Sequence, residues 1–144
     1  MLRFLLLHEL GHRRYHHLLL STLAGWACAT IGLVCCDATI IRLSPTSPGS
    51  IAYVPWLALL FTAWMVLGQP ALAYLGRRLE YQADRFYLDH GGSLAEMSAA
   101  LGELSQRDLA RTDTTRRRQS LIEPVPIITR RLLAATLHLA GKGT

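Results

Sequence analysis

The chain has 144 residues, 51% of them hydrophobic, and a formal net charge of +5. This length suits a single domain, and the apolar content excludes a disordered or low-complexity chain. The three cysteines lie inside one apolar run, so they provide neither a complete disulfide framework nor a Cys-x-x-Cys zinc site: Cys28, Cys35 and Cys36.

Residues 1–17 are predicted to form a helix that carries the sequence HELGH. Residues four apart on a helix differ by about 40° around its axis and about 6 Å along it, so His8 and His12 can present their imidazoles to one metal ion. Glu9 is rotated from them by about 100°, which places it to contact a metal-bound water rather than the metal.

The neighbourhood of this motif is rich in histidine, which leaves a second pairing open. His12 and His16 are also four residues apart. Only His8 and His12 have the adjoining glutamate, so we favour them as the metal pair. His16 and His17 are interpreted as residues near the membrane edge.

Two long apolar runs follow the first helix. Residues 18–41 contain a single charge, Asp37, and residues 51–75 contain none. Each run is long enough to cross a bilayer as a helix. Both are apolar around their whole circumference, and the rest of the chain is too short and too charged to bury them in a soluble core. We therefore predict a transmembrane hairpin, with a pair of buried core helices as the alternative.

The link between the runs, residues 42–50, contains two prolines and a glycine, which predict a tight loop. Pairs of arginines flank the other ends of the two runs, at 13–14 and 77–78, whereas the loop has only Arg42. The positive-inside rule then places both termini in the cytoplasm.

Residues 76–92 are predicted to form a helix that ends at a pair of glycines. Glu80 and Asp84 share one face of it. A zinc peptidase site uses three protein ligands and leaves a fourth position to water, and Glu80 is the candidate for the third ligand. Asp84 can accept a hydrogen bond from a ligand histidine. The alternative for this acidic pair is a solvated face balanced by neighbouring arginines.

The predicted topology brings the candidate ligands to similar heights. His12 lies six residues before the first run and Glu80 five residues after the second. If both helices continue straight beyond the membrane at 1.5 Å per residue, the two residues stand about 8 to 9 Å above the same membrane face. The hairpin therefore predicts one metal site that contains both.

Residues 93–144 are predicted to form a C-terminal helical region. Ser93 and Glu96 make a capping box at the start of a helix. A basic run at 116–118 indicates a solvated face or contact with anionic lipid rather than nucleic-acid binding. The stretch from 127 to 140 is amphipathic.

HELGH, the two-span hairpin and the sequence LEYQAD at 79–84 together resemble the integral-membrane zinc peptidases typified by HtpX and the CAAX prenyl endopeptidases. The resemblance covers about residues 5–104. It implies cleavage of membrane-associated or misfolded polypeptides at a site that faces the cytoplasm. It also implies roles for five residues: His8, His12 and Glu80 as zinc ligands, Glu9 as general base and Asp84 as the carboxylate behind a ligand.

The chain departs from the family pattern in two places. Only seven residues precede His8, where the family usually has membrane helices and an edge strand that binds substrate. The family also tends to carry a Thr-His-Pro element before its terminal helix, and residues 123–131 contain no histidine. Arg130 is the candidate for the arginine that follows this element, with a surface arginine as the alternative. We therefore expect this chain to hold zinc but to cleave polypeptides poorly by itself.

We predict a mostly α-helical integral-membrane zinc endopeptidase. Zinc would polarise the scissile carbonyl and a water, and Glu9 would take the proton of that water and pass it to the leaving amine. A sensor peptidase of the BlaR type is an alternative enzyme, although Ala83 before Asp84 fits the HtpX pattern better. The alternative from another class is a non-catalytic membrane scaffold that is derived from a peptidase or is a truncated piece of one.

Overall fold

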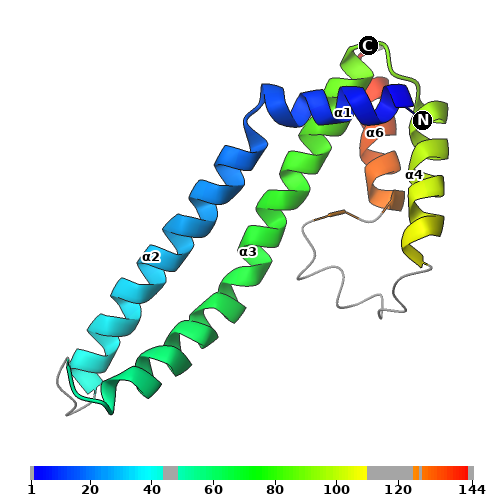
Figure 1. The fold of residues 1–144 in the computed structure, drawn as a ribbon. Helices are drawn as coiled ribbons and strands as arrows, with labels where there is room; N and C mark the ends of the chain where they lie inside the picture. Colours follow the sequence, from blue (N-terminus) through cyan, green and yellow to red (C-terminus); the bar gives the residue numbers. More distant parts are fainter. Residues whose placement is uncertain (1, 44–48, 110–124, 127, 143–144) are drawn as a thin grey trace.

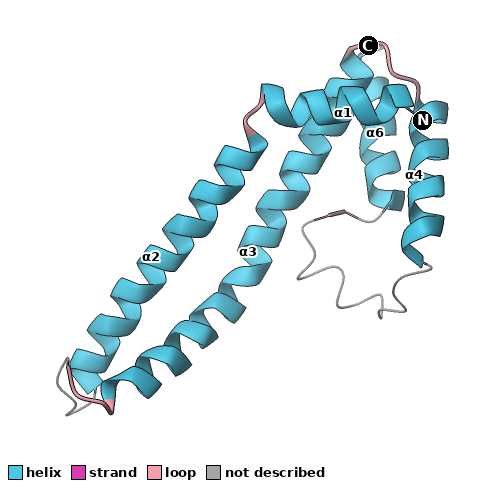
Figure 2. Ribbon diagram, in the orientation of Figure 1, coloured by secondary structure: helices cyan, strands magenta, loops and turns pink. Residues whose placement is uncertain are grey.

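The computed structural model describes residues 2–43, 49–109, 125–126 and 128–142. Within these residues the chain is mostly α-helical and contains no strand, which confirms the predicted fold class (Figure 2). The helices that it describes are α1 (Leu2–Arg14), α2 (His17–Leu43), α3 (Tyr53–Asp89), α4 (Leu94–Leu109) and α6 (Ile128–Lys142).

The helices fall into two regions (Figure 1). Helices α2 and α3 run side by side as a long antiparallel pair, and α1, α4 and α6 gather around the last turns of α3. We call α2 together with residues 53–75 of α3 the hairpin. The head consists of α1, residues 76–89 of α3, α4 and α6.

The hairpin exposes its apolar side chains. Both α2 and α3 are long and apolar enough to cross a membrane, and only 6% of the residues in the apolar stretch of each are buried. Large side chains such as Leu23, Trp26 and Val66 point outward. A core helix of a soluble protein would be mostly buried, so the alternative of a soluble core is wrong. The exposed apolar surface indicates a membrane protein.

Small residues bring the two hairpin helices together. Gly32 of α2 lies against the ring of Trp64, and a Cβ at Gly32 would overlap Trp64 Cδ1. The indole Nε1 donates a hydrogen bond to the carbonyl oxygen of Cys28 at 3.0 Å. In lipid, such close packing and interhelical hydrogen bonding are the main sources of attraction between helices.

The second span and the Glu80 helix are one continuous helix. Helix α3 has 37 residues, including Pro70 in its interior, and is therefore about 55 Å long. It ends where Gly91 adopts a left-handed backbone with a φ of +78°. Half of the predicted capping box of the next helix is present: the backbone N–H of Glu96 donates to Ser93 Oγ at 3.1 Å, but the backbone N–H of Ser93 donates to the hydroxyl of Tyr87 instead of to Glu96. The expected continuation of the second span as a helix beyond the membrane thus holds for α3.

The expected straight continuation does not hold for α1. This helix ends at Arg14, and the chain turns at Tyr15 and His16, where His16 has a left-handed φ of 54°. Helix α1 then lies across the end of α3 instead of along the axis of α2 (Figure 1). The equal heights that the sequence predicted are therefore not what brings the candidate ligands together. The crossing of α1 over α3 does this.

Two contacts fix that crossing. At one end of α1, the fully buried ring of Phe4 packs edge-on against Tyr87, with ring centroids 5.0 Å apart. At the other end, a Cβ on Gly11 would lie 3.2 Å from both Ala83 Cα and Phe86 Cβ, so the absence of a side chain lets the two backbones approach. His8 lies between these contacts, on the same face of α1. It therefore points at α3.

Candidate metal centre

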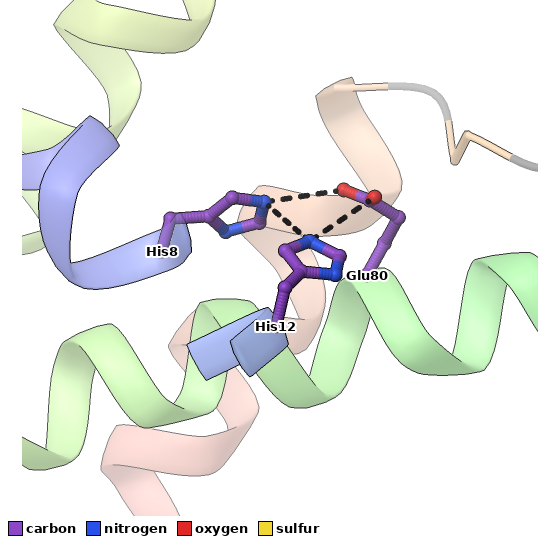
Figure 3. A group of neighbouring side chains, drawn as sticks. All are labelled: His8, His12 and Glu80. Atoms are coloured by element: carbon purple, nitrogen blue, oxygen red, sulfur yellow. Dashed lines mark hydrogen bonds and ion pairs between the residues drawn. The ribbon is translucent and has the colours of Figure 1, made fainter. Parts of the chain in front are cut away.

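The crossing brings His8 and His12 of α1 against Glu80 of α3 (Figure 3). The Nε2 atoms of the two histidines are 3.1 Å apart. Each also lies 3.4 Å from a Glu80 carboxylate oxygen, His8 from Oε2 and His12 from Oε1. The three residues that the sequence nominated as ligands therefore converge on one point, although they come from two helices far apart in the chain.

The donor atoms of this cluster fit a zinc ion. Two imidazole nitrogens and a carboxylate oxygen are a ligand set that catalytic zinc uses, and bonds of about 2.0–2.1 Å in tetrahedral geometry separate the ligand atoms by about 3.3–3.4 Å. Here the two nitrogens are 3.1 Å apart, and each lies 3.4 Å from a different oxygen of Glu80. One ligand atom from each of the three residues lies within 4.8 Å of the other two. Two facing Nε2 lone pairs repel each other unless a proton or a cation lies between them. The arrangement thus suits a metal ion with little movement.

Asp84 supports His8 from behind. One turn after Glu80 on α3, its Oδ1 lies 3.1 Å from His8 Nδ1. The contact is an ion-pair distance without the alignment of a hydrogen bond, and Asp84 is only 3% exposed. This placement leaves His8 Nε2 directed at Glu80. The sequence predicted a hydrogen bond between Asp84 and a ligand histidine, and the structure shows an ion-pair contact there instead.

Sequence reasoning missed Arg131, which is the partner of Asp84. Arg131 is 7% exposed and donates from Nε and Nη2 to the two Asp84 oxygens at 2.8 and 2.5 Å. Its Nη1 also lies 3.5 Å from Glu80 Oε2. Arg130 is exposed, as the surface alternative predicted, so it is not the arginine of this site. Helical spacing is the one feature of the sequence that points to Arg131: it is four residues before Ala135, and the two form the buried face of α6.

His17 is a second residue whose role was misjudged. It is 2% exposed, and its Nδ1 lies 2.9 Å from Nδ1 of His12. The interpretation of His17 as a membrane-edge residue did not foresee this burial and contact, whereas His16 is exposed at the turn. No pattern in the sequence indicates this contact, because residues five apart on a continuous helix are about 140° apart around its axis and cannot meet.

The cluster opens onto a cleft of about 750 Å³. His12, Glu80 and the exposed Glu9 line it, together with leucines from the first turns of α2. Val125, which lies in the stretch where the Thr-His-Pro element was sought, is also in the lining. Substrate and water can thus reach the ligand set from the side on which Glu9 stands.

Comparison with protein-family models decides the family. The model described as Peptidase family M48 matches residues 1–137, nearly the whole chain. The chain belongs to peptidase family M48. Neither the comparison with curated proteins nor the comparison with solved structures gave a match.

Membership of the M48 family implies a metallopeptidase function, because peptidases of this family are typically metal-dependent. The resemblance noted in the sequence is thereby confirmed at the level of the family. The group of His8, His12 and Glu80 is the candidate metal site among the residues that the structure describes.

The electrostatics of this M48 site favour a bound cation. Burial raises the pKa values of Glu80 and Asp84, but their contacts with His8 and Arg131 outweigh burial and hold both pKa values below their ordinary range. Burial lowers the pKa of His12, whereas for His8 the contacts with Asp84 and Glu80 outweigh burial and raise the pKa. When His8 and His12 are neutral, as metal ligands must be, two ionised carboxylates face one guanidinium, which leaves an excess negative charge at the site.

Proposed function

We propose that this M48 chain is a zinc-dependent membrane endopeptidase that hydrolyses peptide bonds at a site facing the cytoplasm. The observation that carries the proposal is the convergence of His8, His12 and Glu80, with donor atoms 3.1 to 3.4 Å apart, at the edge of a cleft that contains Glu9. These three residues would hold zinc. Asp84 and Arg131 would keep His8 in its orientation.

The residues of the cleft support a hydrolytic mechanism. Zinc, when bound, supplies a Lewis acid that polarises a carbonyl and makes water a better nucleophile. Glu9 is exposed in the cleft beside His12, so its carboxylate can accept the proton of a water held there. Glu9 then returns that proton to the amine that leaves when the peptide bond breaks.

The position of the cleft supports a polypeptide substrate at the membrane surface. Its apolar lining includes Leu18 and Leu19 at the start of α2 and Leu79 of α3. A substrate in contact with both the ligands and these leucines lies where the hairpin emerges from the head. The arginines at 13–14 and 77–78, against the single Arg42 in the loop, favour the cytoplasmic side for this end.

Metal analysis of the detergent-purified chain tests the ligands. We expect about one zinc per chain, and substantially less after His12→Ala or Glu80→Ala. Glu9→Gln should retain the zinc, because Glu9 is not a ligand in this proposal. Zinc content that neither ligand substitution changes would refute the ligand assignment.

Cleavage of a membrane-anchored reporter tests the activity. The residues that the structure describes contain no strand against which a substrate could be aligned, so we expect slow cleavage, and Glu9→Gln should abolish it. Slow cleavage that persists in Glu9→Gln would come from a contaminant. Zinc binding without any Glu9-dependent cleavage would favour the non-catalytic scaffold.

Labelling of single cysteines tests the topology. Ile51, 94% exposed in the turn before α3, and Ser98, exposed on α4, are replaced by cysteine in a background without the three native cysteines. We expect membrane-impermeant reagents to reach Ser98→Cys only from the cytoplasmic side and Ile51→Cys only from the other. Labelling of both from one side would exclude the hairpin across the membrane.

A further inference from the structure

We propose that His17 is a positioning residue that fixes the ring and the tautomer of His12. The proposal goes beyond the zinc peptidase function and rests on it for the role of His12 as a ligand. His17 is nearly inaccessible, at 2% exposure, and each of its two ring nitrogens has a partner. Its Nδ1 lies 2.9 Å from His12 Nδ1, and its Nε2 lies 3.2 Å from Oε1 of Gln82 on α3.

The turn at residues 15–16 makes the contact between His17 and His12 possible. On an unbroken helix, His16 would be the neighbour of His12 and His17 would point about 140° away. The left-handed backbone of His16, with a φ of 54°, exchanges these roles and directs His17 back at α1. The turn is therefore part of the site, not only a link to the membrane.

Aromatic contacts hold the ring of His17 in place. Tyr15 stacks on it, with ring centroids 5.8 Å apart and an angle of 17° between the rings. Tyr15 in turn packs edge-on against Phe86 of α3, at 5.9 Å and 90°. The imidazole of His17 is thus held between α1 and α3 by contacts within the chain.

The hydrogen bonds that run from Gln82 through His17 to His12 determine which ring nitrogen of each histidine carries its proton. Gln82 Oε1 can only accept, so the neutral ring of His17 carries its proton on Nε2 and leaves Nδ1 as an acceptor. His12 must then donate from Nδ1, which leaves the lone pair of His12 Nε2 directed at Glu80. Asp84, at 3.1 Å, favours the same tautomer for His8. The two ligand histidines are thus supported by different partners, a carboxylate and a third histidine.

Zinc affinity, measured by competition with a chromophoric chelator, tests the role of His17. We expect His17→Ala to weaken zinc binding by about 10- to 100-fold, as loss of the partner of a ligand histidine commonly does. Two further variants separate positioning from packing. His17→Gln keeps an acceptor for His12 Nδ1–H and should recover part of the loss, whereas His17→Phe fills the space without an acceptor and should not.

A substitution of a histidine outside the site serves as the control for the zinc-affinity measurements. His138→Asn removes another partly buried histidine, one that pairs with Asp89 on the surface, and should leave zinc affinity unchanged. Wild-type affinity in His17→Phe, or a loss in His17→Gln as large as in His17→Ala, would overturn the proposal in favour of packing.

The tautomers can also be measured without metal, which separates this proposal from the proposed function. Nitrogen-15 NMR of labelled histidines in the metal-free protein, assigned with single variants, should show His12 protonated on Nδ1 and His17 on Nε2. His17→Ala should abolish the preference in His12. A proton on His12 Nε2 would overturn the proposal. If this tautomer is found but no zinc depends on His12, the zinc function fails and the positioning of His12 stands.

Discussion

The head and the hairpin place polar and apolar side chains in opposite ways. In the head, the charged side chains of Asp84 and Arg131 are only 3 and 7% exposed, while in the hairpin large apolar residues such as Trp26 and Val66 are 64 to 70% exposed. Buried charges require partners, so the head depends on a few specific contacts. Lipid is as apolar as the protein interior, so the hydrophobic effect does not hold the two hairpin helices together. The hairpin therefore depends on the close packing of its helices. A substitution should therefore act by a different mechanism in each region.

Arg131→Met should have the largest effect. It removes the guanidinium that pairs with the carboxylates of Asp84 and Glu80 in the interior of the head. Removal of one member of a buried ion pair typically costs about 3–5 kcal/mol. We expect the free energy of unfolding of the metal-free protein in detergent to fall by this amount.

Arg130→Met is the matched control for Arg131→Met, because Arg130 is exposed on the same turn of α6. It should change the free energy of unfolding by no more than about 0.5 kcal/mol. Equal effects of the two substitutions would show that the buried pair of Asp84 and Arg131 does not stabilise the head.

Gly11→Ala should disturb the crossing of α1 over α3. The added Cβ would lie 3.2 Å from Ala83 Cα, which is backbone and cannot rotate away. We expect a loss of about 1–3 kcal/mol in the free energy of unfolding and a clear drop in zinc affinity, because α1 carries two of the three ligands. Gly102→Ala in α4, where the Cβ meets nothing within 4 Å, should leave zinc affinity unchanged. Unaltered zinc affinity in Gly11→Ala would contradict the importance of the crossing.

Gly32→Ala should affect the hairpin alone. The new Cβ would displace the ring of Trp64 and weaken its hydrogen bond to the Cys28 carbonyl. Interhelical hydrogen bonds in membranes contribute about 0.6 kcal/mol on average, so we expect a loss of about 1 kcal/mol and no change in zinc affinity. Gly25→Ala, with open space around the Cβ, should be neutral in both measurements. A drop in zinc affinity with Gly32→Ala would show that the two regions are coupled.

The sequence predicted the parts of the molecule that depend on regular helices. The spans follow from unbroken apolar runs, and the shared faces of His8 with His12 and of Glu80 with Asp84 follow from a spacing of four residues. The return of the chain in a hairpin predicted that both faces lie at the same end of the two spans, although their contact depends on the crossing of α1 over α3. These features need only the geometry of single helices and the direction of the chain.

The parts that could not be predicted depend on irregular backbone and on tertiary contacts. Nothing in the residues around His16 requires a left-handed turn, and without that turn neither the crossing of α1 nor the contact of His17 with His12 follows. Arg130 and Arg131 are equivalent in chemistry, and only the face of α6 that packs on α3 decides between them. A one-residue difference of this kind is settled by packing and not by composition.

Asp89→Asn should have the smallest effect, because it removes an ion pair at the solvent-exposed edge of the head. Asp89 accepts from His138 Nε2 at 2.7 Å and from Lys142, joining α3 to the end of α6, but its side chain is 38% exposed. Screening by solvent limits such a pair to at most about 1 kcal/mol. Burial raises the pKa of Asp89, but His138 and Lys142 outweigh it and lower that pKa.

The lowered pKa of Asp89 gives this ion pair a defined pH dependence. A carboxyl whose pKa is lower in the folded protein contributes its full stabilisation above the unfolded value of about 3.9 and loses it as the pH falls through the folded value. The melting temperatures of wild type and Asp89→Asn should therefore differ slightly at pH 7 and converge below about pH 4. Added salt should reduce the difference at pH 7, since the pair is exposed. A difference that persists unchanged in acid would mean that Asp89 acts through packing of α6 and not through its charge.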